Sequence, residues 1–160
     1  MKHQFGFFDE GNRLRRLSDM GDPLVKLSQV VDFESFRPVL DQALRKDDHG
    51  QGGRPAFDRV MLFKILLLQQ MYGIADDKTE YLINDRLSFQ RFLGLTLGAK
   101  VPDAKTIWLF REKLVQGGVE KTLFALFTGH LTEKGLITHK GSIVDASFVD
   151  APRQRNSRKE

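Results

Sequence analysis

Residues 141–156, GSIVDASFVDAPRQRN, place a carboxylate inside an otherwise apolar run that has the composition of a β-strand. Asp145 stands in the middle of this run. A carboxylate in a strand that is buried on both faces costs free energy unless it is paired, hydrogen-bonded or bound to a metal. Ser147 and Asp150 are close enough in sequence to be its partners. The pattern fits a metal-binding aspartate and a structural one equally well.

A predicted helix over residues 103–116, DAKTIWLFREKLVQ, carries the second group of candidate residues. Its predicted buried stripe consists of Ile107, Trp108, Phe110, Leu114 and Val115. Lys105, Thr106 and Lys113 then lie on the other side, with Arg111 at the margin. Lysine and arginine neutralise phosphates or reach guanine edges, so this helix is the candidate recognition helix of a helix-turn-helix type of module. A solvated charged face on an ordinary bundle helix gives the same pattern.

The charge balance permits nucleic-acid binding without demonstrating it. The chain has 25 Lys and Arg against 21 Asp and Glu, a net charge of +4. A separate basic cluster, Arg153, Arg155, Arg158 and Lys159, lies near the C-terminus, where a frayed and solvated terminus is the simplest interpretation.

Several other chemistries are excluded by residue type and spacing. The chain has no cysteine, so it forms neither a disulfide nor a thiolate zinc site. Its four histidines, His3, His49, His130 and His139, show no spacing of four residues that would favour a metal site. Gly50, Gly52 and Gly53 follow no apolar strand and precede no Lys-Ser/Thr pair, so they are not a phosphate loop.

Helices account for most of the remaining sequence. Residues 57–72, FDRVMLFKILLLQQMY, are apolar on most faces, which predicts the buried centre of a bundle. Further helices are predicted to start at Asp22-Pro23, at Asp32, at an Asp77–Glu80 capping box, at Ser88 and at Asp103. Pro38 either lies in the first turns of the helix that starts at Asp32 or kinks that helix.

The ends of these predicted helices are marked by glycine. Gly94 is expected to end its helix in a left-handed turn, and the helix that starts at Asp103 is expected to stop at Gly117-Gly118. A last helix carries an apolar face over residues 119–131 and ends near Gly135.

The predicted organisation has three parts. Residues 1–29 form an arm without periodic pattern and a first helix, residues 30–136 form the helical domain, and residues 137–160 begin a second domain. Within the helical region, the glycine-rich segment 46–57 is expected to be a linker. Without a signal peptide or an apolar run of membrane-spanning length, we expect a soluble cytoplasmic protein that makes no membrane contact.

Three blocks in the same order resemble the N-terminal half of bacterial insertion-sequence transposases of the insertion-sequence-five (InsH-like) group. The blocks are GRPAFDRVMLFKILLLQQMYGIADDKTEYLINDRLSFQRFLGL, PDAKTIWLFREKL and IVDASFVDAPRQRN. The resemblance extends from about Val30 to the C-terminus. It implies a helical region that binds the terminal inverted repeats of the element on double-stranded DNA, in the nucleoid.

The resemblance also assigns a role to Asp145. It implies that Asp145 is the first carboxylate of an Asp-Asp-Glu triad in a ribonuclease H-like domain, which holds two Mg²⁺ ions for phosphoryl transfer. Arg153 and Arg155 would then lie in a loop beside that active site, near DNA. A homo-oligomer or a downstream transposase fragment would be a further partner.

The fold class that follows is mainly α. A helical, helix-turn-helix-like DNA-binding domain is followed by the first strand of a truncated ribonuclease H-like α/β domain. DNA transposition, through binding of the inverted repeats, is the expected function. A non-enzymatic repressor or dominant-negative protein, and a decayed relic of the transposase, are the alternatives.

The chain by itself is expected to be catalytically inactive and to bind no Mg²⁺, because no later strand up to residue 160 supplies the second Asp and the Glu. A labelled duplex with the cognate ends, incubated with the chain and Mg²⁺, should stay intact. Clear nicking that depends on Mg²⁺ would contradict this expectation.

Overall fold

The computed structural model describes residues 9–44, 56–96 and 98–137, and every regular element in these ranges is helical. The elements are α1 (Asp9–Asp19), α2 (Pro23–Val30), the 3₁₀ helix η1 (Phe33–Phe36), α3 (Arg37–Ala43), α4 (Arg59–Tyr72), α5 (Asp76–Asp85), α6 (Leu87–Leu93), α7 (Ala104–Gly117) and α8 (Glu120–Glu133). The prediction of a mainly helical domain is confirmed for these residues. The predicted strand around Asp145 lies outside the described ranges, so its ribonuclease H-like character stays a prediction.

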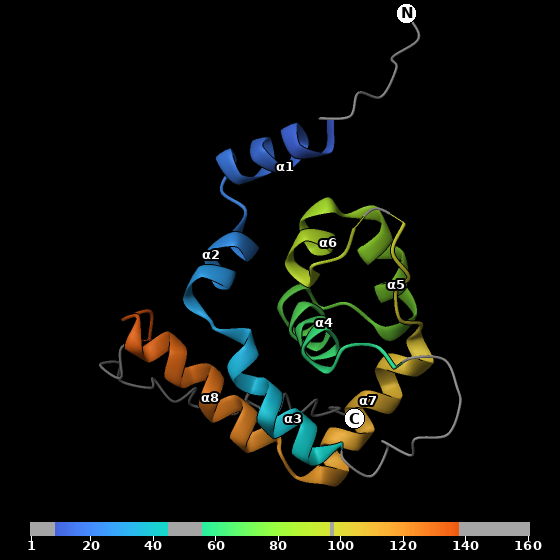
Figure 1. Ribbon diagram of the computed structural model, residues 1–160, viewed down its shortest axis with the longest axis vertical. Coiled ribbons are helices and arrows are strands. Elements are labelled where there is room, and N and C mark those ends of the chain that lie inside the picture. Colours follow the sequence, from blue (N-terminus) through green and yellow to red (C-terminus); the bar gives the residue numbers. More distant parts are fainter. Residues whose placement is uncertain (1–8, 45–55, 97, 138–160) are drawn as a thin grey trace, which may run out of the picture.

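Helix α4 lies inside the bundle, where α3, α6, α7 and η1 contact it (Figure 1). Asp58 caps its start by accepting a hydrogen bond from the Met61 amide at 2.8 Å. Ile65 and Leu68 are 0% and 1% exposed, and burying such side chains contributes about 1.5–3 kcal/mol each. The predicted central helix is therefore confirmed, although Tyr72 at its end is partly exposed.

Aromatic rings join η1 to the centre of the bundle. Phe36 is fully buried, and its ring centroid lies 4.9 Å from that of Phe63 on α4. Phe33 meets Phe92 of α6 edge to face at 5.4 Å. Pro38 sits in the first turn of α3, where its missing amide hydrogen costs no helical hydrogen bond. The region before the predicted linker thus shares one core with the region after it.

Two predicted helix starts are wrong, and the structure shows why. The first turn of α5 closes on the carbonyl of Ala75, which accepts from the Lys78 amide at 3.1 Å, so Asp77 lies inside the helix. The first turn of α6 closes on the carbonyl of Arg86, so Ser88 is also inside its helix. In both helices, the amide of the third residue donates to a backbone carbonyl and not to the predicted capping side chain.

Other predicted ends are confirmed. Asp103 caps α7, and Gly94 and Gly118 end α6 and α7 with positive φ values of 72° and 61°, which favour glycine. Within α7, the predicted burial of Trp108 and Val115 is wrong, since they are 48% and 54% exposed. These two residues are seven apart, so they share one side of the helix, away from the buried stripe.

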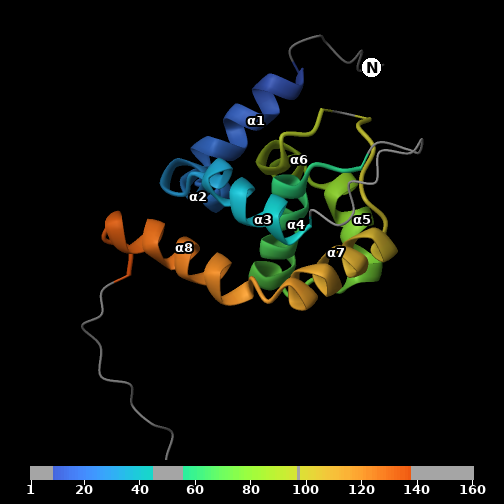
Figure 2. The same cartoon turned by 60° about the horizontal axis from the view of Figure 1, so that its bottom comes forward.

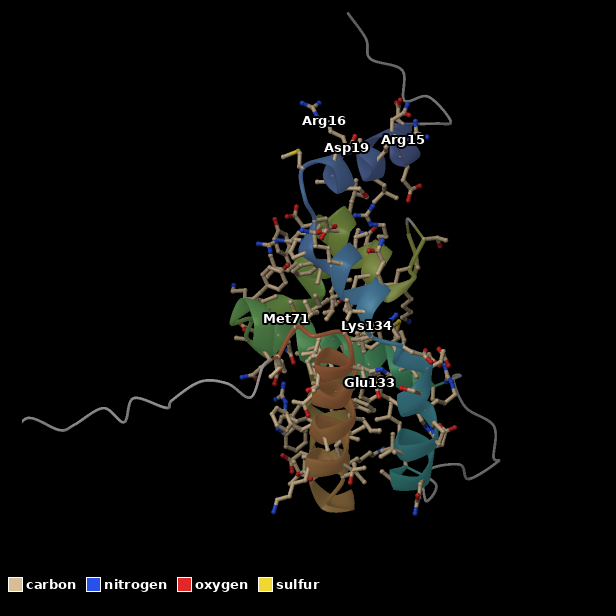
Figure 3. The ribbon with its side chains drawn as sticks, turned by 90° about the vertical axis from the view of Figure 1, so that its left-hand side faces the viewer. Arg15, Arg16, Asp19, Met71, Glu133 and Lys134 are labelled. Atoms are coloured by element: carbon tan, nitrogen blue, oxygen red, sulfur yellow. The ribbon has the colours of Figure 1, made fainter. Side chains whose placement is uncertain are left out.

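Helix α1 corrects the prediction that the first twenty residues lack periodic structure. It lies at one end of the bundle, and α8 lies at another (Figures 1 and 2). None of its residues is fully buried, and Arg15 and Arg16 project away from the other helices (Figure 3). Leu14 and Leu17 are half-buried, which is too weak an apolar pattern for sequence reasoning to find.

Arg91 of α6 holds α1 and α2 in place. Its guanidinium donates to the Leu14 carbonyl at 2.9 Å, to Ser18 Oγ at 2.8 Å and to Asp22 Oδ2 at 2.6 Å. The Asp22 side chain is only 5% exposed and also caps α2 through the Leu24 amide. One side chain therefore joins three helices by charge-assisted hydrogen bonds.

Replacing Arg91 with Ala should release α1. Its amide hydrogens should exchange roughly tenfold faster or more, because hydrogen bonds to a charged group are removed, whereas amides in α4 should change little. Hydrogen exchange read by mass spectrometry measures this. Arg86→Ala is the control, since that guanidinium packs over the Phe89 ring at 5.0 Å. Unchanged exchange in α1 would contradict the assigned role of Arg91.

Candidate nucleic-acid interface

Helix α7 positions the candidate DNA-binding residues that the structure describes. Asp103 accepts a hydrogen bond from the Thr106 amide at 2.8 Å, and this cap fixes where the helix begins. Ile107, Phe110 and Leu114 face the core and are at most 4% exposed. The buried stripe sets which way every other side chain of α7 points.

The four predicted residues of α7 do not all share one face. Lys105 is exposed, and Thr106 and Lys113 are half-buried on the side of α7 that faces α3. Arg111 precedes Lys113 by two positions, about 200° around the helix axis, so it lies on the opposite margin. It faces α5 there. The structure therefore brings three of the candidates to one side and separates the fourth.

Arg111 takes part in a polar network between α4, α5 and α7. Its guanidinium donates to Asp76 Oδ2 at 3.0 Å, to Asp76 Oδ1 at 2.7 Å and to Gln69 Oε1 at 2.8 Å. Gln69 is 7% exposed and donates in turn to Asp76 Oδ1 and Thr79 Oγ1. The hydrogen bonds from Arg111 hold the pKa of Asp76 below its ordinary value, and Asp76 raises the pKa of Arg111.

This network gives Arg111 a structural role that sequence reasoning missed. A glutamine on the inward side of an apolar helix was the available signal, because a buried amide needs partners. Arg111 already binds Asp76 and Gln69. A DNA contact by this residue would therefore have to be made in addition to those hydrogen bonds. Its DNA-binding role stays a prediction.

Lys113 lines a groove between α3 and the junction of α7 with α8. The groove has a volume of about 500 Å³. Its lining residues are Val39, Gln42, Ala43, Lys113, Gln116, Gly117, Val119 and Thr122. Figure 1 shows α3 running beside the point where α7 ends and α8 begins. The groove is thus lined by both polar side chains and apolar residues that pack against the core.

The described helices carry no excess of positive charge. Basic and acidic side chains are equal in number over residues 9–44, 56–96 and 98–137, whereas the whole chain has a net charge of +4. The basic excess therefore belongs to the rest of the sequence. Any attraction of these helices for DNA must come from local grouping of charges.

The other predicted site residues, Asp145, Arg153 and Arg155, lie outside the described residues. Within the described ranges, no three His, Asp or Glu side chains come together as a metal site would require. No helix of those ranges is both long enough and apolar enough to cross a membrane.

The family model described as Transposase domain (DUF772) matches residues 12–113, from α1 to most of α7. The chain belongs to this transposase family. Its role is therefore in transposition, and the predicted transposase relationship is confirmed. The insertion-sequence-five group and the Asp-Asp-Glu class stay predictions. No solved structure matches the chain.

The Arg111–Asp76 pair of the transposase domain should make stability depend on pH. Because the hydrogen bonds from Arg111 hold the folded pKa of Asp76 below its unfolded pKa, the ionised form stabilises the fold above the unfolded pKa, and the contribution is lost as pH falls through the folded pKa. Asp76→Asn should cost about 1 kcal/mol at pH 7, a value reduced by the partial exposure of Arg111. The difference from the wild type should shrink as the solution is acidified.

Urea unfolding of both proteins between pH 7 and pH 3 measures this difference. Asp77→Asn is the matched control, because it removes the same charge from an exposed position one residue later on α5. An equal loss of stability in the two variants would show that the helix N-terminus, and not the pair with Arg111, is responsible.

Proposed function

We propose that the described helices are the DNA-binding portion of an insertion-sequence transposase and that they recognise the terminal inverted repeats of its element. The observation that carries the proposal is the family match, which extends through α7 to Lys113 and includes every predicted DNA-contacting residue of that helix. Double-stranded DNA is then the partner, and the bound protein is associated with the nucleoid.

Helix α7 has suitable dimensions for this role. Its 14 residues span about 21 Å, and the major groove of DNA, about 12 Å wide, accommodates a helix. Lys105 is exposed in the first turn, beside the Thr106 hydroxyl. Contacts of lysine with phosphates would position the helix, and contacts with base edges would specify the sequence.

For the intact transposase we propose the Asp-Asp-Glu chemistry of the insertion-sequence-five group. Asp145 would be the first Mg²⁺ ligand, acting with a second Asp and a Glu supplied from elsewhere, and Arg153 and Arg155 would contact DNA near that centre. Bound Mg²⁺ supplies activation of a hydroxyl nucleophile and stabilisation of the leaving oxygen. A homo-oligomer or a transposase fragment encoded downstream would complete the assembly.

A salt titration of DNA binding tests the proposal. The wild-type chain should bind a duplex with the inverted repeat, with affinity falling linearly in log[salt] at a slope of about −0.9 per neutralised phosphate. In the double variant Lys105→Ala/Lys113→Ala the slope should flatten by about 1 for each phosphate that the variant no longer neutralises.

The matched control is Lys26→Ala/Lys78→Ala, which removes two exposed lysines from α2 and α5. Fluorescence anisotropy with a labelled duplex gives all the affinities. If the α7 variant and the wild type showed the same slope, α7 would not be the DNA-binding helix. Absence of wild-type binding would refute the proposed function as a whole.

A further inference from the structure

We propose that the groove between α3 and the α7–α8 junction receives the phosphate backbone of the bound DNA. This inference rests on the proposed function and goes beyond it in two ways. It selects the side of α7 that faces α3 as the DNA-binding side, and it adds Gln42, Gln116 and Thr122 to the DNA-binding residues.

The groove has hydrogen-bond donors on both of its walls. Gln42 comes from α3, Lys113 and Gln116 come from α7, and Thr122 comes from the first turn of α8. Gln42, Gln116 and Thr122 are exposed, and Lys113 is half-buried. Among the described residues that line the groove, none is acidic. A phosphodiester, which offers anionic acceptor oxygens only, fits such a lining.

These side-chain types match what a DNA backbone requires. An ammonium group neutralises a phosphate, while amide and hydroxyl groups donate hydrogen bonds to phosphate oxygens without reading the sequence. Val39 and Val119 supply the apolar part of the lining, against which sugars could pack. The arrangement is therefore suited to a backbone more than to a small polar ligand.

Close packing of two helices shapes the groove. A Cβ atom added to Gly117 would lie 3.2 Å from Cβ of Ala43, closer than most such contacts, so α3 and α7 pack tightly there. The walls diverge on the solvent side of this contact, where Gln42 and Gln116 are exposed. Because the contact belongs to the folded bundle, the groove is formed before any ligand binds.

Lys105 extends the same side of α7 beyond the groove. From Lys105 to Lys113 the helix rises about 12 Å and turns through a net of about 80°. Thr106 lies within about 20° of the direction of Lys113. Phosphates along one DNA strand could therefore contact the first turn of α7 and the groove together, whereas Arg111 on the other margin is held by Asp76.

Two other clefts among the described residues suit an anion less well. The cleft between η1 and the end of α8 is lined by Lys64, Lys134 and His130 but also by Asp32, Glu34 and Glu133, whose charges oppose a phosphate. Figure 3 shows Glu133 there at the end of α8. The cleft between α2 and α6 has a volume of about 250 Å³, half that of the α3–α7 groove. The α3–α7 groove is larger than the second of these clefts and, unlike the first, has no acidic side chain in its described lining.

Adding negative charge to the groove tests the proposal. In the full chain, Gln42→Glu/Gln116→Glu changes two amides to carboxylates of nearly the same shape. Affinity for a labelled inverted-repeat duplex, measured by anisotropy, should fall roughly tenfold or more, since like charges across an interface strongly oppose association. Because backbone contacts carry no sequence information, an unrelated duplex should lose affinity by a similar factor.

The matched control is Gln29→Glu/Gln70→Glu, the same chemical change at exposed positions on α2 and α4. It should retain most of the affinity. Thermal unfolding verifies that both variants fold. If Gln42→Glu/Gln116→Glu does not fold, Thr122→Glu is measured in its place.

Each outcome decides between the two proposals. Equal losses of affinity in the groove and control variants would overturn the groove and point to net charge alone. Wild-type affinity in the groove variant would also overturn it, while leaving DNA binding by the transposase domain intact. If the wild-type chain bound neither duplex, the proposed function and the groove would fall together, and an acidic protein partner would be the better candidate.

Discussion

A helix that is apolar on nearly every side must be covered on every side, and this constraint on α4 organises the bundle. Buried residues of α4 include Met61, Phe63, Ile65 and Leu68, which do not lie in one stripe. Short helices before and after it provide the cover. The burial is not directional, however, so it does not determine the angle at which each neighbour packs.

Polar contacts supply that direction. Arg111 binds Asp76 in a bidentate manner and reaches Gln69, which aligns α7 and α5 on one side of α4. Arg91 performs the same task for α1 and α2 at the other end of the bundle. Arg111, a predicted DNA-binding residue, and Arg91 thus each hold neighbouring helices together. Without these bonds, Oδ2 of the buried Asp22 carboxylate and Oε1 of the buried Gln69 amide would lose their arginine partners.

Features of the fold could be predicted from sequence where the interacting residues are close to one another in the chain. Periodicity predicted α4 and the inward residues of α7, and local chemistry predicted the Asp103 cap and the turn at Gly118, because those signals lie within a few residues. Helix α1 depends on Arg91, more than 70 residues away, and was missed. The site was predicted in composition but not in arrangement, since the place of Arg111 at the margin of α7 does not reveal that it binds Asp76, 35 residues earlier in the chain.

The equal numbers of basic and acidic residues in the described helices restrict how they could meet DNA. A neutral body exerts little long-range attraction, so the helices alone would not steer a duplex toward themselves. Contacts at short range, where the described lining of the groove groups donors and has no carboxylate, would then decide how DNA is oriented. The basic excess elsewhere in the chain would provide attraction that depends on salt. Under this division, a change in the groove alters the fit of the complex, and a change in the basic segments alters mainly the rate of encounter.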